Sequence, residues 1–182
     1  MRKTDARIRY TQGVLKQALL SFLQEKPINK ITVKEVCERA ELNRATFYAH
    51  YSDCFALLES IEEDLLEAFQ QSLKLVDSFD VTALIEAIYT MIEQQQEACR
   101  VLIFQNVCPN VLRRMISLAR DESISYWKRH LHHITDAELE MLYTHLSNGL
   151  MHVVAEGYEK YSREEVVRFV NRIVQCSLSQ FQ

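Results

Sequence analysis

The chain contains very few residues that turn a backbone, and this restricts its fold more than any other feature. Among 182 residues there are three glycines and two prolines. A β-rich fold needs Gly, Pro or Asn at each hairpin, whereas a helical bundle needs far fewer such residues. Apolar residues also recur at spacings of three and four along most of the chain, which is the period of an amphipathic helix. The sequence therefore predicts an all-α fold.

Residues 31–50 indicate two short helices joined by a tight turn. Thr32 and Glu35 have the spacing of a capping box, in which each side chain accepts a backbone N–H at the start of a helix. Asn43 can cap a second helix by accepting an N–H two or three residues further on. That helix is too short to be stable alone, and it carries Arg, Thr, Tyr and His on one side and Phe47 on the other. Such a pair is a helix-turn-helix, whose second helix can lie in the major groove of DNA.

The segment from Thr11 to Leu58 resembles the DNA-binding domain of the TetR/AcrR family of transcriptional regulators. The resemblance rests on I-T-V, followed by A-x-L-N-R-x-T-F-Y-x-H-Y and an amphipathic helix. It covers about the first third of the chain, and the remainder fits the family in being helical, with a loose similarity to the branch common in Firmicutes. The resemblance implies a regulator, usually a repressor, that binds a palindromic operator in double-stranded DNA as a homodimer. A small-molecule effector, whose identity the sequence does not reveal, would release it.

The resemblance also implies two domains. We expect a three-helix helix-turn-helix DNA-binding domain at residues 1–52 and a helical ligand-binding and dimerisation domain at residues 53–182. A long helix from about residue 53 to residue 75 would link them, because apolar residues follow one face of that segment. After a break at residues 77–80, further helices are predicted over three segments: 81–96, 98–105 and 109–132.

Charge is distributed unevenly between the two ends of the chain. Residues 1–58 contain ten Lys and Arg against six Asp and Glu, a formal charge of +4. Residues 59–182 contain eleven against nineteen, a formal charge of −8. A basic front and an acidic remainder suit a protein that offers one end to a polyanion, although chance clustering would give the same asymmetry.

The second helix of the motif offers groups for both base and phosphate contacts. Arg44 is its first residue, and a guanidinium can donate two hydrogen bonds to the O6/N7 edge of guanine. Ala45 beside it can touch a thymine methyl group. Thr32 lies at a helix N-terminus, where backbone N–H groups favour an anion. The resemblance assigns phosphate contacts to four polar residues: Asn43, Thr46, Tyr48 and His50. Two aromatic residues are expected to anchor the helix in the core: Phe47 and Tyr51.

One position departs from the family pattern. The family usually places a lysine near the start of the helix that follows the H-Y pair, and here that position is Cys54. A thiol cannot make a charged phosphate contact, so one expected contact is in doubt. Lys34 or the basic residues at the N-terminus could take its place.

The last two helices are expected to form a hairpin around a loop at residues 158–162, with a second capping box at Ser162 and Glu165. The resemblance implies that this hairpin pairs with its copy in a homodimer. The alternative is that it closes the core of a single chain. The predicted interface residues are Leu142, Leu146, Gly149, Leu150, Val153, Val170, Ile173 and Val174.

The implied ligand pocket would lie between helices of the second domain. Its candidate residues combine aromatic and polarizable surface, and ordinary core packing is the alternative for each. They are Met91, Phe104, Met115, Tyr126, Trp127, Tyr143 and Met151. The histidines of this domain lack a third ligand at consistent spacing, so neither a metal site nor a cofactor is expected.

Other function classes have little support in the sequence. We find no Gly-rich phosphate loop, HExxH or GxSxG motif, so we expect no enzyme. No apolar run approaches the ~18 residues of a membrane span, and there is no signal peptide. The five widely spaced cysteines are typical of reduced, cytoplasmic thiols. Two alternatives stay open: a DNA-binding regulator controlled by a protein partner, and a helical metal- or ligand-binding protein that does not bind DNA.

Overall fold

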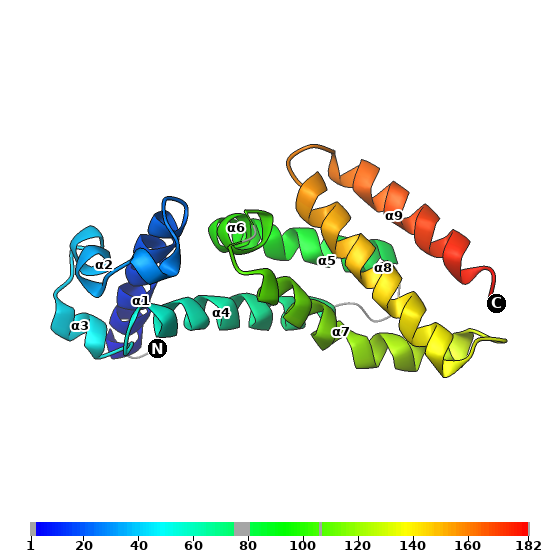
Figure 1. Ribbon diagram of the computed structural model, residues 1–182, viewed down its shortest axis with the longest axis horizontal. Helices are drawn as coiled ribbons and strands as arrows, with labels where there is room; N and C mark the ends of the chain where they lie inside the picture. Colours follow the sequence, from blue (N-terminus) through cyan, green and yellow to red (C-terminus); the bar gives the residue numbers. More distant parts are fainter. Residues whose placement is uncertain (1–2, 75–80, 106, 182) are drawn as a thin grey trace. The chain divides into compact units, whose positions relative to one another are not determined.

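The computed structural model describes residues 3–74, 81–105 and 107–181, and these residues fold into helices (Figure 1). The predicted all-α fold class is therefore confirmed. Contacts divide the chain into two compact units, Met1–Leu65 with Glu97–Val107 and Leu66–Gln96 with Cys108–Gln182. The predicted end of the long helix at residue 75 and the predicted break at residues 77–80 lie outside the described residues.

The first unit contains the predicted helix-turn-helix. Its helices are α1 (Lys3–Leu23), α2 (Val33–Arg39), α3 (Arg44–Tyr48) and the first half of α4 (Cys54–Lys74), with a 3-10 turn, η1 (Ile28–Lys30), before α2. α1 contacts α2 and α2 contacts α3. Leu15, Val36 and Phe47, one from each of these helices, are all completely buried. Burying each side chain of this kind stabilises the fold by roughly 1.5–3 kcal/mol. The five-residue α3 is too short to be stable alone, so it depends on this burial.

Residues 98–105 differ from the predicted single helix. One turn of α-helix, α6 (Gln96–Cys99), continues as a π-helix, η2 (Arg100–Phe104). Cys99, Val101 and Leu102 have no exposed surface, so this segment buries consecutive side chains.

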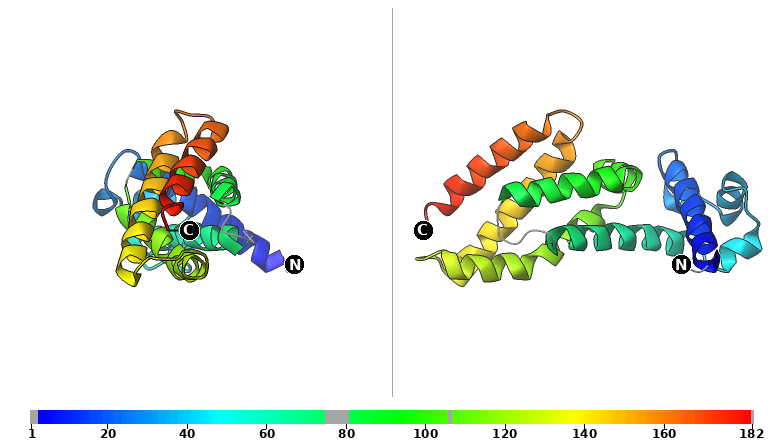
Figure 2. Two further views of the ribbon diagram at one scale, coloured as in Figure 1. Left: turned by 90° about the vertical axis from the view of Figure 1, so that its right-hand side faces the viewer. Right: turned by 180° about the vertical axis from the view of Figure 1, so that it is seen from behind.

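The second unit is a helical bundle. Its helices are α5 (Val81–Gln94), α7 (Pro109–His130), α8 (Asp136–Gly157), α9 (Arg163–Leu178) and the second half of α4. α7 packs on α8, α5 packs on α9, and α8 and α9 form the predicted hairpin (Figure 2). The predicted capping box at Ser162 and Glu165 is confirmed, and a further one joins Thr135 to Glu138. Pro109 occupies the first turn of α7, where its missing N–H costs no helical hydrogen bond.

Two arginines fasten neighbouring helices of the second unit. Arg120 on α7 makes a two-pronged contact with the Glu140 carboxylate on α8, and its Nε donates to Oε2 at 3.2 Å. Arg163 on α9 donates to the main-chain oxygen of Glu86 on α5 at 2.8 Å and also pairs with the carboxylates of Glu86 and Glu93. Partly exposed ion pairs add little stability, so these arginines act chiefly by fixing how the helices pack.

None of the described helices is both long enough and apolar enough to cross a lipid bilayer.

Candidate functional site

The start of α2 is held by the capping box predicted from the sequence. The Glu35 N–H donates to Thr32 Oγ1 at 3.3 Å, and the Thr32 N–H donates to Glu35 Oε2 at 2.9 Å. Lys26 Nζ lies 2.6 Å from the other carboxylate oxygen of Glu35. The hydrogen bonds from Lys26 and then from Thr32 hold the pKa of Glu35 at about 2, so this carboxylate is charged at neutral pH.

The start of α3 is held by Asn43. Its Oδ1 accepts the Thr46 N–H at 2.8 Å and the Thr46 hydroxyl at 3.0 Å. On the opposite side of the five-residue helix, Phe47 is fully buried, as predicted, and its ring meets that of Tyr48 edge-on at 5.6 Å. The cap and the buried ring together fix the direction in which the exposed side of α3 points.

The residues predicted to contact DNA do not all lie equally open to a partner. Arg44, Ala45 and Tyr48 are exposed, Tyr48 by 57%. Asn43 is exposed but serves as the cap, while Thr46 and His50 are half-buried. The exposed Thr32 donates its hydroxyl hydrogen to Glu35 at 2.7 Å, so its backbone N–H and hydroxyl are both engaged. The DNA-contacting roles of these residues remain predictions.

The turn between α2 and α3 has a strained residue that the sequence pattern did not reveal. Glu41 has φ 54°, in the left-handed region that glycine occupies without strain. It follows the end of α2 in a Schellman-type arrangement: the Leu42 N–H donates to the Cys37 carbonyl at 2.9 Å and the Glu41 N–H to the Glu38 carbonyl at 3.3 Å. The hydrogen bonds of the turn therefore require a conformation that costs a non-glycine residue energy.

The first turn of α4 has a buried thiol at the position where the family pattern has a cation, followed by an exposed aromatic ring. Cys54 is 4% exposed, and burial raises the pKa of its thiol to about 11. Asp53 caps the helix by accepting the Ala56 N–H at 2.8 Å. Phe55 is 57% exposed, although Leu58 and Ile61, which follow it at helical spacing, are buried.

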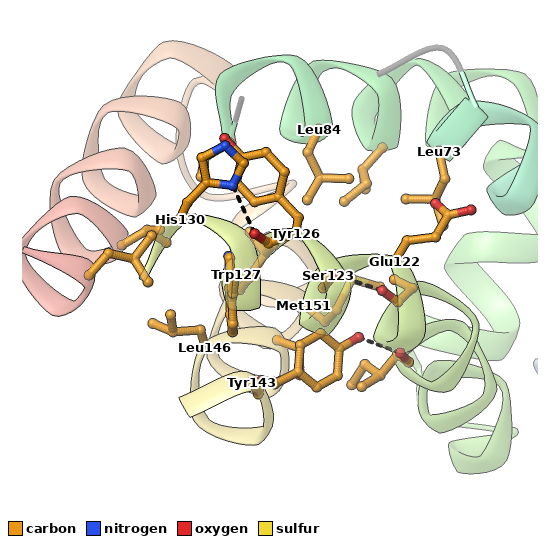
Figure 3. A pocket seen from close by; sticks show the side chains of 18 of the residues that line it. Leu73, Leu84, Glu122, Ser123, Tyr126, Trp127, His130, Tyr143, Leu146 and Met151 are labelled. Carbon is orange, nitrogen blue, oxygen red and sulfur yellow. Dashed lines mark hydrogen bonds between the residues drawn. The ribbon is translucent and has the colours of Figure 1, made fainter. Parts of the chain in front are cut away.

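The second unit contains a cavity of about 350 Å³ that is open to solvent on one side (Figure 3). Its walls come from α4, α5, α7, α8 and α9, and most of the side chains are aliphatic or aromatic. Four predicted pocket residues line it: Tyr126, Trp127, Tyr143 and Met151. Met91 and Met115 are not among the lining residues; they are 2% and 0% exposed and pack in the core. Phe104 belongs to the other compact unit.

The polar groups of the cavity are few and mostly engaged. Tyr143 Oη donates to the Ile116 carbonyl at 2.5 Å, and burial raises the pKa of this phenol to about 12. Ser123 Oγ donates to the Ala119 carbonyl at 2.6 Å. The His130 ring stacks on Tyr126 with centroids 4.0 Å apart, and its Nδ1 lies 2.8 Å from the Tyr126 carbonyl oxygen.

Three of the polar lining residues were missed from the sequence: Glu122, Ser123 and His130. With Tyr126 and Trp127 they recur every three or four residues along α7, so they share one face of that helix. Helical spacing from the two aromatic residues would have found them.

The hairpin of α8 and α9 leaves apolar side chains uncovered in a single chain. Of the predicted interface residues, Leu146, Val170 and Val174 are buried, Leu142, Leu150 and Val153 are half-buried, and Gly149 and Ile173 are exposed. Phe169, on the same helix as Ile173, is 44% exposed, and Ile173 itself 41%. A groove between the helices is lined by His152, Glu156, Tyr161 and Phe169 among others. Leu150 lines the cavity as well.

Across the described ranges, no three or more His, Cys, Asp and Glu side chains come together in a way that could hold a metal ion.

Comparisons with known proteins agree on the type of fold. No protein-family model matches the chain. Over 62 residues the chain is 37% identical to YxbF, an uncharacterized HTH-type transcriptional regulator of Bacillus subtilis strain 168; the match covers 34% of this chain but 16% of that protein.

Two solved structures match nearly the whole chain. A TetR transcriptional regulator from Streptococcus agalactiae 2603V has a TM-score of 0.67 and 24% identity, over 94% of this chain and 97% of the other. A protein assigned to the TetR family from Mesorhizobium loti MAFF303099 has a TM-score of 0.59 and 17% identity, over 100% and 99% of the two chains. The protein therefore has the all-α fold of the TetR-family transcriptional regulators.

Proposed function

We propose that the protein is a DNA-binding transcriptional regulator that reads an operator with α3. The observation that supports this most directly is the exposed side of α3, where Arg44, Ala45 and Tyr48 project from a helix fixed by the Asn43 cap and the buried Phe47. A positioned arginine at the start of such a helix suits bidentate recognition of guanine in the major groove. Residues 1–52 would then bind DNA, and residues 53–182 would bind the ligand and form the dimer.

The distribution of charge supports the same proposal, with a refinement. Several cations of the basic front are engaged within the protein: Lys16 pairs with Asp64, Lys26 with Glu35 and Arg39 with Glu25. Arg39 also lies over the Phe22 ring, 3.6 Å from its centroid. Fewer basic groups are then available for phosphates than the charge of +4 suggests, so α3 itself carries more of the recognition.

We propose that α8 and α9 form the interface of a homodimer. Phe169 and Ile173 on α9 are large apolar residues exposed in the single chain, and the adjoining groove offers a surface for a second copy. Two copies related by a two-fold axis would present two α3 helices to two half-sites of a palindrome.

We propose further that the cavity in the second unit holds the small-molecule effector and that binding releases the operator. A volume of about 350 Å³ lies within the ~300–1,000 Å³ typical of ligand sites, and an apolar lining with a few placed polar groups has the composition of such sites. A ligand that binds the DNA-free state more tightly shifts the population away from DNA, which is the behaviour of a repressor released by its effector.

The experiment that tests the proposal is a mobility-shift titration across a salt series, with the duplex adjoining the protein's own gene and a scrambled duplex of equal length. We expect tighter binding to the first duplex, with an affinity that falls as salt rises because phosphate contacts release counterions. Arg44→Ala should remove the preference, while Arg129→Ala, the same loss of charge at an exposed position of α7, should retain it. Equal binding to both duplexes at every salt concentration would contradict the proposal.

A further inference from the structure

Among the described residues, the walls of the cavity carry one carboxylate but no lysine or arginine. Glu122 is among the described lining residues, whereas Lys and Arg are absent from them; the imidazole of His130 also lines the cavity. A carboxylate such as a fatty acid would find no lysine or arginine to pair with among these residues. Removing an anion from water without a compensating partner is unfavourable.

Glu122 has no ion pair with any described residue. Two basic residues of the same helix are committed elsewhere: Arg120 to Glu140 and Asp121, and Lys128 to Asp136 at 2.8 Å. Figure 3 shows the Glu122 side chain extending toward Leu73, at the edge of the apolar wall. The Glu122 carboxylate is exposed to water, and no described side chain competes as its ion-pair partner, so a cation bound in the cavity would find it unpaired.

Aromatic faces line the same space. Tyr126 and Trp127 follow Glu122 by one turn of α7, and the Trp127 ring meets Tyr143 at a centroid distance of 5.9 Å. Such ring faces carry negative partial charge and attract cations, and the attraction strengthens when the cation is desolvated. Residues 59–182 add a formal charge of −8, which raises the local concentration of cations further.

We infer that the cavity selects a bulky apolar organic cation, with its hydrocarbon or aromatic body among the aliphatic walls and its positive charge between the Glu122 carboxylate and the rings of Tyr126 and Trp127. This inference rests on the proposed effector cavity and adds the chemical class of the effector. The carboxylate supplies charge, the rings supply both apolar area and cation–π attraction, and the apolar walls exclude small hydrated ions such as Na⁺.

The test uses two probes of nearly the same size and shape and opposite charge, tetraphenylphosphonium and tetraphenylborate. Trp127 is the single tryptophan of the chain and lines the cavity, so its fluorescence reports occupancy directly. We expect the phosphonium to bind more tightly than the borate. Glu122→Gln should weaken phosphonium binding about fivefold, the factor that corresponds to ~1 kcal/mol for a partly exposed ion pair. Asp121→Asn, the adjacent carboxylate, which does not line the cavity, should leave the ratio of the two affinities unchanged.

The outcomes separate this inference from the function on which it rests. If the borate binds as tightly as the phosphonium or more tightly, and still loosens the operator complex, the cavity is an effector site but the cationic class is wrong. If neither probe changes Trp127 fluorescence, the cationic class is refuted, because the cavity then does not take a bulky apolar cation. If Glu122→Gln leaves phosphonium affinity unchanged, Glu122 is not the residue that recognises the positive charge.

Discussion

Asn43 accepts two hydrogen bonds from Thr46, one from its backbone N–H at 2.8 Å and one from its hydroxyl at 3.0 Å. This pair of contacts satisfies a donor that a helix start leaves without an intrahelical partner, and it does so in a helix of five residues. A helix so short depends on its cap and on the buried Phe47 for its conformation. The exposed residues between cap and anchor are consequently held in fixed directions, which is what sequence reading in a groove requires.

Arg44 is the residue on which base recognition is expected to depend. Arg44→Ala should cost about 1–3 kcal/mol at a single base-pair position and relax specificity there, because a bidentate contact to one base is lost. Binding of the variant to a panel of operators with single-base changes would measure this. Arg129→Ala on α7 serves as the matched control for net charge. An unchanged specificity profile for Arg44→Ala would remove Arg44 from base reading.

Replacing Glu41 with glycine, the residue that the turn geometry prefers, should stabilise the protein. The substitution relieves the left-handed strain of roughly 1–2 kcal/mol but adds an unfolded-state entropy cost of about 0.4–1 kcal/mol. We therefore expect Glu41→Gly to stabilise the protein by about 0.5–1 kcal/mol, measured by urea unfolding.

The control for Glu41 lies in the preceding helix. Glu38 is an exposed residue of α2 with ordinary helical geometry, so Glu38→Gly should destabilise by roughly 0.5–1 kcal/mol. If both substitutions destabilise the protein alike, the positive φ at Glu41 imposes no strain.

A substitution at Ile173 tests the proposed dimer without changing the lining of the cavity. It is 41% exposed in the single chain and absent from the described lining of the cavity, so Ile173→Glu should leave the fold intact. In a packed interface the new carboxylate would be buried without a partner, and we expect monomers in sedimentation at concentrations where the natural protein is dimeric. Leu150 is less suitable because it lines the cavity. A persistent dimer would show that this part of α9 lies outside the interface.

Glu35 should make stability depend on acid pH. Its pKa in the folded protein is about 2, against an ordinary value of 4.5, because Lys26 and Thr32 hydrogen-bond its charged form. A carboxyl with a lowered pKa contributes stability that is fully present above the ordinary value and is lost as pH falls toward about 2. The melting temperature of the natural protein should exceed that of Glu35→Gln at pH 7, and the gap should close between pH 4.5 and about 2. A gap independent of pH would assign the difference to shape rather than charge.

Local features of the fold could be predicted because each depends on neighbouring residues. The capping boxes of Thr32 with Glu35 and of Ser162 with Glu165 follow from a spacing of three, and the structure confirms both. The burial of Phe47 follows from its place on the apolar side of a short helix. The strain at Glu41 could not be predicted, because a glutamate gives no sign of left-handed geometry when the turn is imposed by hydrogen bonds from flanking residues.

The cavity was harder to predict because it depends on where helices fail to fill space. Met115 and Trp127 both lie on the apolar side of α7, yet the first is fully packed and the second borders the cavity. Helical spacing assigns a residue to a face but not to a void. Glu122 was not among the predicted pocket residues because these were chosen for aromatic and polarizable surface, yet its exposed carboxylate lines the cavity.

Selection of bound sequences from a pool of random duplexes by the purified protein would show directly whether α3 reads an operator. We expect enrichment of an inverted repeat, because a two-fold dimer would read DNA with two copies of α3. The centres of the two half-sites should lie one helical turn, about 34–36 Å, or a multiple of it apart. We also expect Arg44→Ala to lose the preference at one position in each half-site. Recovery of no enriched sequence would contradict the claim that the protein reads an operator through α3.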